Sequence, residues 1–169
     1  METQLEHILT HSYKAGMISY MGAHPEDFEE AIELAIADKK TYSWRAAWLL
    51  WSCMEENDKR IQRYIKSIIN TLKTKNDDHQ RELLKILLQM ELNEDYEGFL
   101  FNVCTDVWEK INKKPSVRLT AFKVMVKIAK KHSDLRREVI LHTQDQYMDS
   151  LSPAVKKAVS KMIKGFERS

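Results

Sequence analysis

The sequence predicts an all-α protein built from a repeating pair of helices. Only 4 glycines and 3 prolines occur in 169 residues, too few for a turn-dense sheet protein or a linker-like chain. Apolar residues recur at helical spacing, and no segment shows the sustained alternation of a half-buried strand. Similar segments return every 36 to 38 residues, a period typical of stacked helical repeats. The chain is therefore expected to form an α-solenoid.

Helix start and stop signals divide the chain into short segments. The first helix is expected near residues 3–21. The second begins at Pro25, because proline lacks an amide hydrogen and suits a first helical turn, and the acidic residues after it favour the positive end of the helix dipole. Its apolar positions Phe28, Ile32 and Ile36 keep helical spacing. The remaining helices are expected at residues 43–55, 59–73, 78–91, 96–111, 115–131, 135–148 and 153–166.

Composition places the chain among soluble globular proteins, with 43% hydrophobic and 31% charged residues. Two cysteines, Cys53 and Cys104, cannot form a disulfide framework and are expected to be inert buried thiols. The first residues lack the charged and apolar regions of a leader, and no apolar run is long enough for a membrane span. We therefore expect a cytoplasmic protein.

The net charge of +2 hides a gradient along the chain. Residues 1–60 hold 6 basic and 11 acidic side chains, whereas residues 110–169 hold 15 basic and 5 acidic ones. Such asymmetry can orient an anionic partner at the basic end. The alternative is a lysine-rich solvated surface that only keeps the chain soluble.

The repeat is clearest near the C-terminus. Residues 115–118, Pro-Ser-Val-Arg, recur as Pro-Ala-Val-Lys at 153–156, a displacement of 38. Arg118 lies 37 residues after Arg81, which lies 36 after Arg45. Each basic residue stands near the start of a helix that follows another amphipathic helix, so the repeating unit is a helical pair.

The string Pro115-x-Val117-Arg118-x-x-Ala121 resembles the second-helix signature of HEAT repeats. The resemblance implies a right-handed α-solenoid with one domain over residues 1–169. In that family an aspartate in the turn between the two helices often pairs with the basic residue of a neighbouring second helix, and Asp38, Asp77 and Asp149 are candidates for this part. The third unit departs from the pattern, because it has Asn112 and no aspartate nearby. The expected parts are a cap helix over 1–22 and repeats near 25–56, 58–92, 95–131 and 133–167.

Two side-chain patterns invite functional readings. Trp44, Trp48 and Trp51 share one helix face, and an exposed stripe of this kind would be an interface or a base-stacking platform. The repeat alignment matches them with Val117, Ala121 and Val124, the apolar face of the second helix in the third unit, so we expect most of the stripe to be core. His7 and His11 have the spacing of a metal pair, but no third ligand is evident nearby, and no metal site is expected.

Catalytic motifs are absent from the sequence. It has no GxSxG, Walker-type or GxGxxG string, and its glycines stand too far apart to form a phosphate-binding loop. The carboxylates lie on the polar faces of acidic helices. We therefore expect a protein that is not an enzyme and has no cofactor.

Second helices of HEAT repeats line the concave surface, so the resemblance implies a groove there. Aligned second helices place apolar residues toward its N-terminal end and basic residues toward its C-terminal end. The alternative is that the apolar residues pack against first helices while the lysines are ordinary surface. The predicted groove residues are Leu50, Met54, Ile86, Met90, Lys123, Lys127, Lys130, Lys161 and Arg168.

The sequence thus favours a noncatalytic scaffold, a monomer that binds an acidic or amphipathic protein or peptide on its concave face and has no membrane partner. Nucleic-acid binding through the basic C-terminal half is the alternative. A third reading is a glycosylase similar to the HEAT-like DNA alkylation-repair enzymes, but Trp108 and Asp106 lie on a first helix and would not face the groove. The acidic first half favours a protein partner, because a groove that follows a nucleic-acid backbone should be basic throughout.

Overall fold

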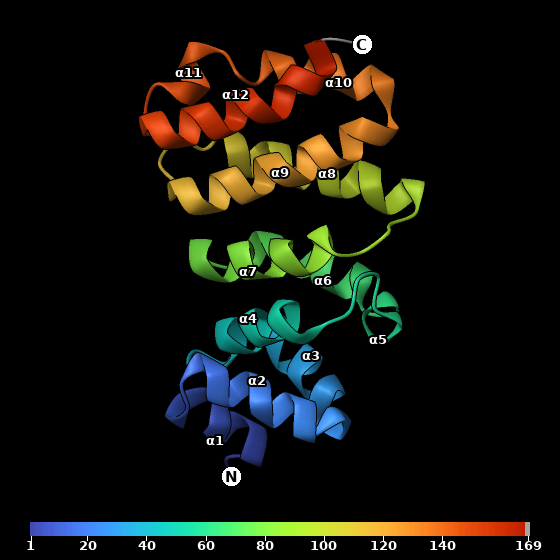
Figure 1. The fold of residues 1–169 in the computed structure, drawn as a ribbon, viewed down its shortest axis with the longest axis vertical. Coiled ribbons are helices and arrows are strands. Elements are labelled where there is room, and N and C mark those ends of the chain that lie inside the picture. Colours follow the sequence, from blue (N-terminus) through green and yellow to red (C-terminus); the bar gives the residue numbers. More distant parts are fainter. Residues whose placement is uncertain (168–169) are drawn as a thin grey trace. The chain divides into compact units, whose positions relative to one another are not determined.

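The computed structural model describes residues 1–167, and over this range the chain is helical with no β-strand (Figure 1). None of the helices described there is long and apolar enough to cross a membrane. The chain divides into two compact units, residues 1–91 and residues 92 onward, called unit 1 and unit 2 below. The boundary between the units falls between the second and third expected repeats.

Unit 1 is organised around α4. This helix packs against α3 on one side and against α7 on another, and α2 also contacts it (Figure 1). The alanines Ala46 and Ala47 are fully buried at these contacts, which lets neighbouring helices approach closely. In chain order the helices of unit 1 are α1 (Gln4–His11), α2 (Lys14–Ala23), the 3₁₀ helix η1 (Pro25–Asp27), α3 (Phe28–Ile36), α4 (Ser43–Cys53), α5 (Lys59–Gln62), α6 (Ile65–Thr71), the 3₁₀ helix η2 (Leu72–Thr74) and α7 (Asp77–Leu88).

Unit 2 is organised around α9, which packs against α8, α10 and α12. Pro115 occupies the first turn of α9, as its start signal predicts. The ring of Trp108 is fully buried, and its centre lies 4.7 Å from the centre of the Phe122 ring. This aromatic pair joins α8 to α9. The helices of unit 2 are α8 (Glu94–Glu109), α9 (Pro115–Lys131), α10 (Ser133–Leu141), α11 (Asp145–Met148) and α12 (Pro153–Glu167).

Three helices predicted as continuous are interrupted. The segment 3–21 breaks where Ser12 and Tyr13 adopt extended backbone. The segments 59–73 and 135–148 are likewise split, into α5 with α6 and α10 with α11. The first break matters for the surface, because it leaves the side chain of Tyr13 92% exposed.

Arg118 is the largest buried polar group of unit 2, with 1% of its surface exposed. Its Nε donates to the carbonyl of Trp108 at 2.8 Å, its Nη2 to the carbonyl of Tyr147 at 2.7 Å, and its Nη1 to the hydroxyl of Ser150 at 3.4 Å. The guanidinium also lies 4.6 Å from the centre of the Trp108 ring. The predicted contact with an aspartate takes a different form here, because Arg118 reaches the turn around Asp149 through a backbone carbonyl and a hydroxyl.

The structure also gives the register of the repeat. Ser43, Gln80 and Arg118 are buried polar residues at the start of α4, α7 and α9, separated by 37 and 38 residues. The sequence alignment used Arg45 and Arg81 instead, which are half-exposed. The sequence alignment is therefore displaced by one residue at α7 and by two at α4. Each residue of displacement rotates the aligned position by about 100° around the helix axis, so the alignment selects the wrong face of the helix.

Candidate functional site

The most distinctive surface of unit 1 is a row of three tryptophans on α4, called the tryptophan row below: Trp44, Trp48 and Trp51. The prediction that most of this row is core is wrong. Trp44 is 38% exposed, and Trp48 and Trp51 are half-buried. The rings of Trp48 and Trp51 meet edge to face with their centres 6.0 Å apart, so these two members of the row form a partly exposed aromatic pair.

Two lysines border the tryptophan row. The ammonium of Lys14, at the start of α2, lies 5.1 Å from the ring centre of Trp48, and that of Lys85, on α7, lies 4.6 Å from that of Trp51. Both are within cation–π range. Among the residues that the structure describes, no carboxylate forms an ion pair with either lysine. Their charges are therefore available to a ligand above the rings.

A carboxylate and an arginine hold the far end of the row. The indole Nε1 of Trp51 donates to Oε2 of Glu82, a residue of α7 that is only 2% exposed. The other oxygen of Glu82 accepts a hydrogen bond from Nε of Arg81 at 2.9 Å. These contacts fix the ring of Trp51 against α7, so this part of the row is preorganised.

An open cavity of about 240 Å³ lies beside the row, where α2 meets α4. Its walls are mostly apolar, and they come from the exposed ring of Tyr13, from Met17 and from two tryptophans. Lys14 and Arg45 stand at its edge, and Nη1 of Arg45 donates to the carbonyl of Leu9 at 2.9 Å. The lining residues are Ser12, Tyr13, Lys14, Met17, Trp44, Arg45 and Trp48.

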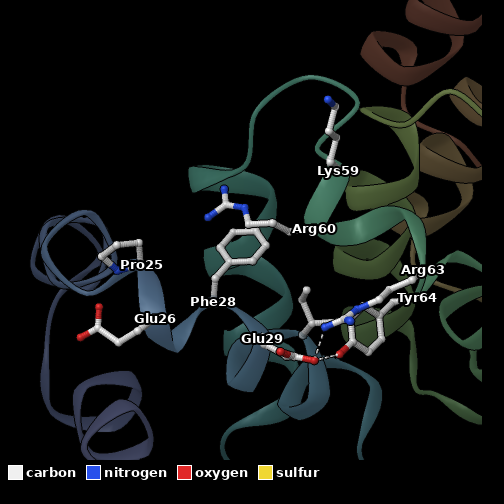
Figure 2. A pocket seen from close by; sticks show the side chains of 9 residues that line it. Pro25, Glu26, Phe28, Glu29, Lys59, Arg60, Arg63 and Tyr64 are labelled. Carbon is white, nitrogen blue, oxygen red and sulfur yellow. Dashed lines mark hydrogen bonds and ion pairs between the residues drawn. The ribbon is translucent and has the colours of Figure 1, made fainter.

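A larger cavity, of about 420 Å³, opens between α3 and the start of α5 (Figure 2). Most of its charged groups are already paired. Arg60 lies over the ring of Phe28 and forms an ion pair with Asp58, while Glu29 accepts hydrogen bonds from Arg63 and Tyr64. A ligand would have to break these contacts, so the larger cavity is the weaker candidate for a site.

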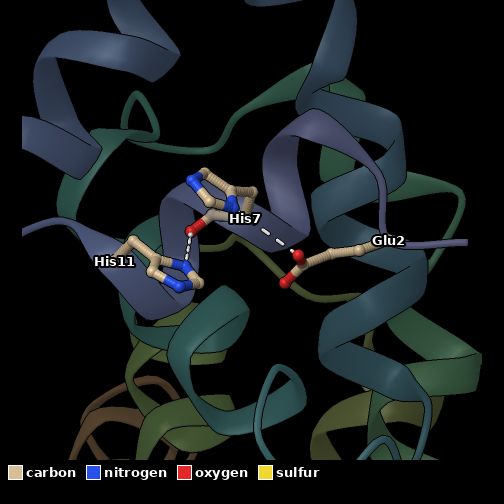
Figure 3. A group of neighbouring side chains, drawn as sticks. All are labelled: Glu2, His7 and His11. Carbon is tan, nitrogen blue, oxygen red and sulfur yellow. Dashed lines mark hydrogen bonds and ion pairs between the residues drawn. The ribbon is translucent and has the colours of Figure 1, made fainter.

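A third cluster lies at the start of the chain, where Glu2, His7 and His11 come together (Figure 3). One ligand atom from each residue lies within 4.8 Å of the others. The hydroxyl of Tyr42 donates to Oε1 of Glu2 at 3.0 Å and holds the pKa of that carboxyl below its usual value. The spacing of the two histidines was visible in the sequence, but Glu2 was not recognised as a third ligand. Its carboxylate is held by Tyr42, which is 40 residues away in the chain.

Burial makes both cysteines poor nucleophiles. Cys104 is fully buried and Cys53 is half-buried, and desolvation raises the pKa of each thiol. The expectation of buried thiols therefore holds fully for Cys104 and in part for Cys53.

A family model described as a HEAT repeat domain matches residues 1–166. The chain belongs to the HEAT repeat family. The match agrees with the all-helical fold and confirms the predicted fold class, while the handedness of the solenoid and its number of helical pairs stay predictions. No curated protein and no solved structure matches the chain. HEAT repeats generally serve as protein-interaction scaffolds, and the family is typically noncatalytic.

The apolar half of the predicted HEAT groove is not on the surface. Leu50, Ile86 and Met90 are at most 1% exposed, and Met54 is also buried, so these side chains pack inside unit 1 as the alternative reading held. The corrected register explains the error. The positions equivalent to Lys123 are Lys85 and Trp48, which are partly exposed, rather than Ile86 and Leu50.

The basic half of the predicted groove is on the surface of unit 2. Lys123 and Lys130 on α9 and Lys161 on α12 are exposed, and Lys127 is half-buried. Arg168 lies outside the described residues. Trp108, considered for a glycosylase site, is fully buried and donates from its Nε1 to the carbonyl of His142 at 2.8 Å, which is a structural role.

Proposed function

We propose that this HEAT repeat chain is a noncatalytic interaction module that binds an acidic, amphipathic segment of a partner protein on the tryptophan row. The row lies on α4, a second helix of its pair, which is the helix that the family resemblance assigns to partner binding. The observation that carries the proposal is the partial exposure of three neighbouring tryptophans, with two lysines over their rings.

Aromatic side chains of this kind are typical binding anchors. Tryptophan, tyrosine and arginine dominate the residues whose truncation costs most at protein interfaces. The cavity beside the row brings all three types together in Tyr13, Arg45, Trp44 and Trp48, around a space of about 240 Å³. An apolar side chain of a partner fits this space, and its burial would remove the rings from water.

Charge defines the rest of the partner. Lys14 lies over the ring of Trp48 and Lys85 over that of Trp51, so a partner carboxylate beside these two rings would meet positive charge. Residues 1–91 as a whole carry 12 basic and 15 acidic side chains, so these cations are a local positive feature of an acidic unit. A basic segment on the tryptophan row would be repelled by both lysines, which are its nearest charges.

The test is a binding series with synthetic helical peptides that carry leucine and phenylalanine on one face. One peptide has glutamate on its polar face, and the matched peptide has lysine there. The glutamate peptide is expected to bind more tightly, and Trp48→Ala should weaken it by about 30-fold, the fold-change for losing 2 kcal/mol at a binding hot spot. Far-ultraviolet circular dichroism checks that the variant stays folded.

A matched control comes from unit 2. The Lys123→Glu/Lys161→Glu variant changes two exposed cations on α9 and α12 and should leave the peptide affinity within about 3-fold. Equal affinity for both peptides, or insensitivity to Trp48→Ala, would contradict the proposal.

Nucleic-acid binding is the competing outcome, favoured by the exposed lysines of unit 2. A short duplex is expected to bind weakly at low salt and to dissociate near physiological salt, because only a few phosphates are neutralised. Sub-micromolar duplex binding at physiological salt that is lost in the double charge-reversal variant would replace the protein-binding proposal.

A further inference from the structure

We propose that Glu2, His7 and His11 form a surface binding site for a zinc-like divalent transition metal ion. The three residues supply one carboxylate oxygen and two imidazole nitrogens, and their ligand atoms lie within 4.8 Å of one another. Imidazole and carboxylate are common zinc ligands, and three protein ligands with one open position are a recurring arrangement. This site is separate from the tryptophan row and does not depend on its function.

The helix creates half of the site. His7 and His11 are four residues apart on α1, which places both rings on one face, and the rings stack with their centres 4.0 Å apart. Both side chains are exposed, so the rings can turn toward a shared ion without disturbing the core. Figure 3 shows Glu2 approaching the same pair from the segment before the helix.

The distances suit a small cation. Nδ1 of His7 lies 3.5 Å from Oε2 of Glu2. Two ligands of a tetrahedral zinc ion with bonds of about 2.1 Å stand about 3.4 Å apart, so this pair is already at the required spacing. The remaining ligand atoms have to close from at most 4.8 Å, a movement of about 1 to 2 Å that side-chain rotation supplies.

Outer contacts already orient two of the ligands. Nδ1 of His11 lies 3.0 Å from the carbonyl of His7 and 2.8 Å from the hydroxyl of Thr10; in the tautomer that donates from Nδ1 to this carbonyl, Nε2 is the nitrogen that can bind a metal. The hydroxyl of Tyr42 holds Oε1 of Glu2, which leaves Oε2 directed at His7. Such second contacts are a regular feature of metal-binding histidines and carboxylates.

The test is calorimetric titration of zinc chloride into the full chain with no affinity tag, since a histidine tag would itself bind zinc. One zinc ion per chain is expected for the wild type. His7→Ala and His11→Ala should each weaken binding by at least 10-fold, and Tyr42→Phe, which removes an outer contact only, by about 10-fold. The ligands are exposed, and an unchanged circular dichroism spectrum checks that each variant is folded.

Two matched controls separate this site from other donors. His24→Ala removes a histidine that contacts Glu26 at 3.0 Å, and Cys53→Ser removes the more accessible thiol. Both variants should bind zinc with the wild-type affinity. Wild-type binding weaker than about 1 mM, or binding that survives both His7→Ala and His11→Ala, would overturn the proposal.

Discussion

Replacing Arg118 by methionine tests how a buried cation holds unit 2 together. Methionine keeps much of the side-chain volume but removes every donor, so the carbonyl oxygens of Trp108 and Tyr147 lose their bonds of 2.8 and 2.7 Å. A buried polar group left unpaired costs about 1 to 3 kcal/mol. Burial also lowers the pKa of Arg118, which means that methionine recovers part of the desolvation cost. We expect Arg118→Met to lower the free energy of unfolding by about 3 kcal/mol.

Urea unfolding followed by far-ultraviolet circular dichroism measures this loss, with a fall in the melting temperature of about 6 to 12 °C as a second readout. If the units unfold separately, the transition of unit 2 should move and that of unit 1 should not. Lys156→Met is the matched control, because Lys156 stands at the equivalent position of α12 but is only half-buried. A loss below about 1 kcal/mol for Arg118→Met would refute the reasoning, since it would mean that water replaces the guanidinium.

Three further predictions follow from burial and charge. Trp108→Ala should cost about 3 to 5 kcal/mol in urea unfolding, and Trp48→Ala less than about half of that, because only the first ring is fully buried. The pKa of Asp58 is lowered from 3.8 to about 2, chiefly by its hydrogen bonds with Arg60. Asp58→Asn should therefore lower the free energy of unfolding by about 2 kcal/mol above pH 4, and this difference should disappear as the pH falls from 4 to 2. Cys104 should resist alkylation by iodoacetamide until the protein is unfolded in urea, as mass spectrometry would show.

Local signals predicted the helices better than they predicted which side of each helix is buried. Pro25, Pro115 and Pro153 lie in the first turn of a helical segment, as expected, because the reason for proline there lies within that turn. The break at Ser12 and Tyr13 was missed, since neither residue is a strong helix breaker such as proline or glycine.

The register of the repeat needed the structure, because loops of different length make its period vary. A displacement of 36 pairs Leu50 with Ile86, and both are buried, whereas a displacement of 37 pairs Trp48 with Lys85, and both face the surface. Arginine was a misleading marker, because the buried polar position is held by different residue types in different pairs. The tryptophan row was visible as a spacing pattern, but its exposure could not be inferred from that spacing alone.

The most direct test of the tryptophan row uses the indole N–H signals of the four tryptophans in an NMR titration. The acidic amphipathic peptide described above is added to the labelled protein, and each signal is assigned by substitution of one tryptophan at a time. The signals of Trp44 and Trp48 are expected to shift on binding, and that of the buried Trp108 should stay in place. Binding that leaves the Trp44 and Trp48 signals unchanged while backbone signals around Lys123 shift would contradict the proposed site.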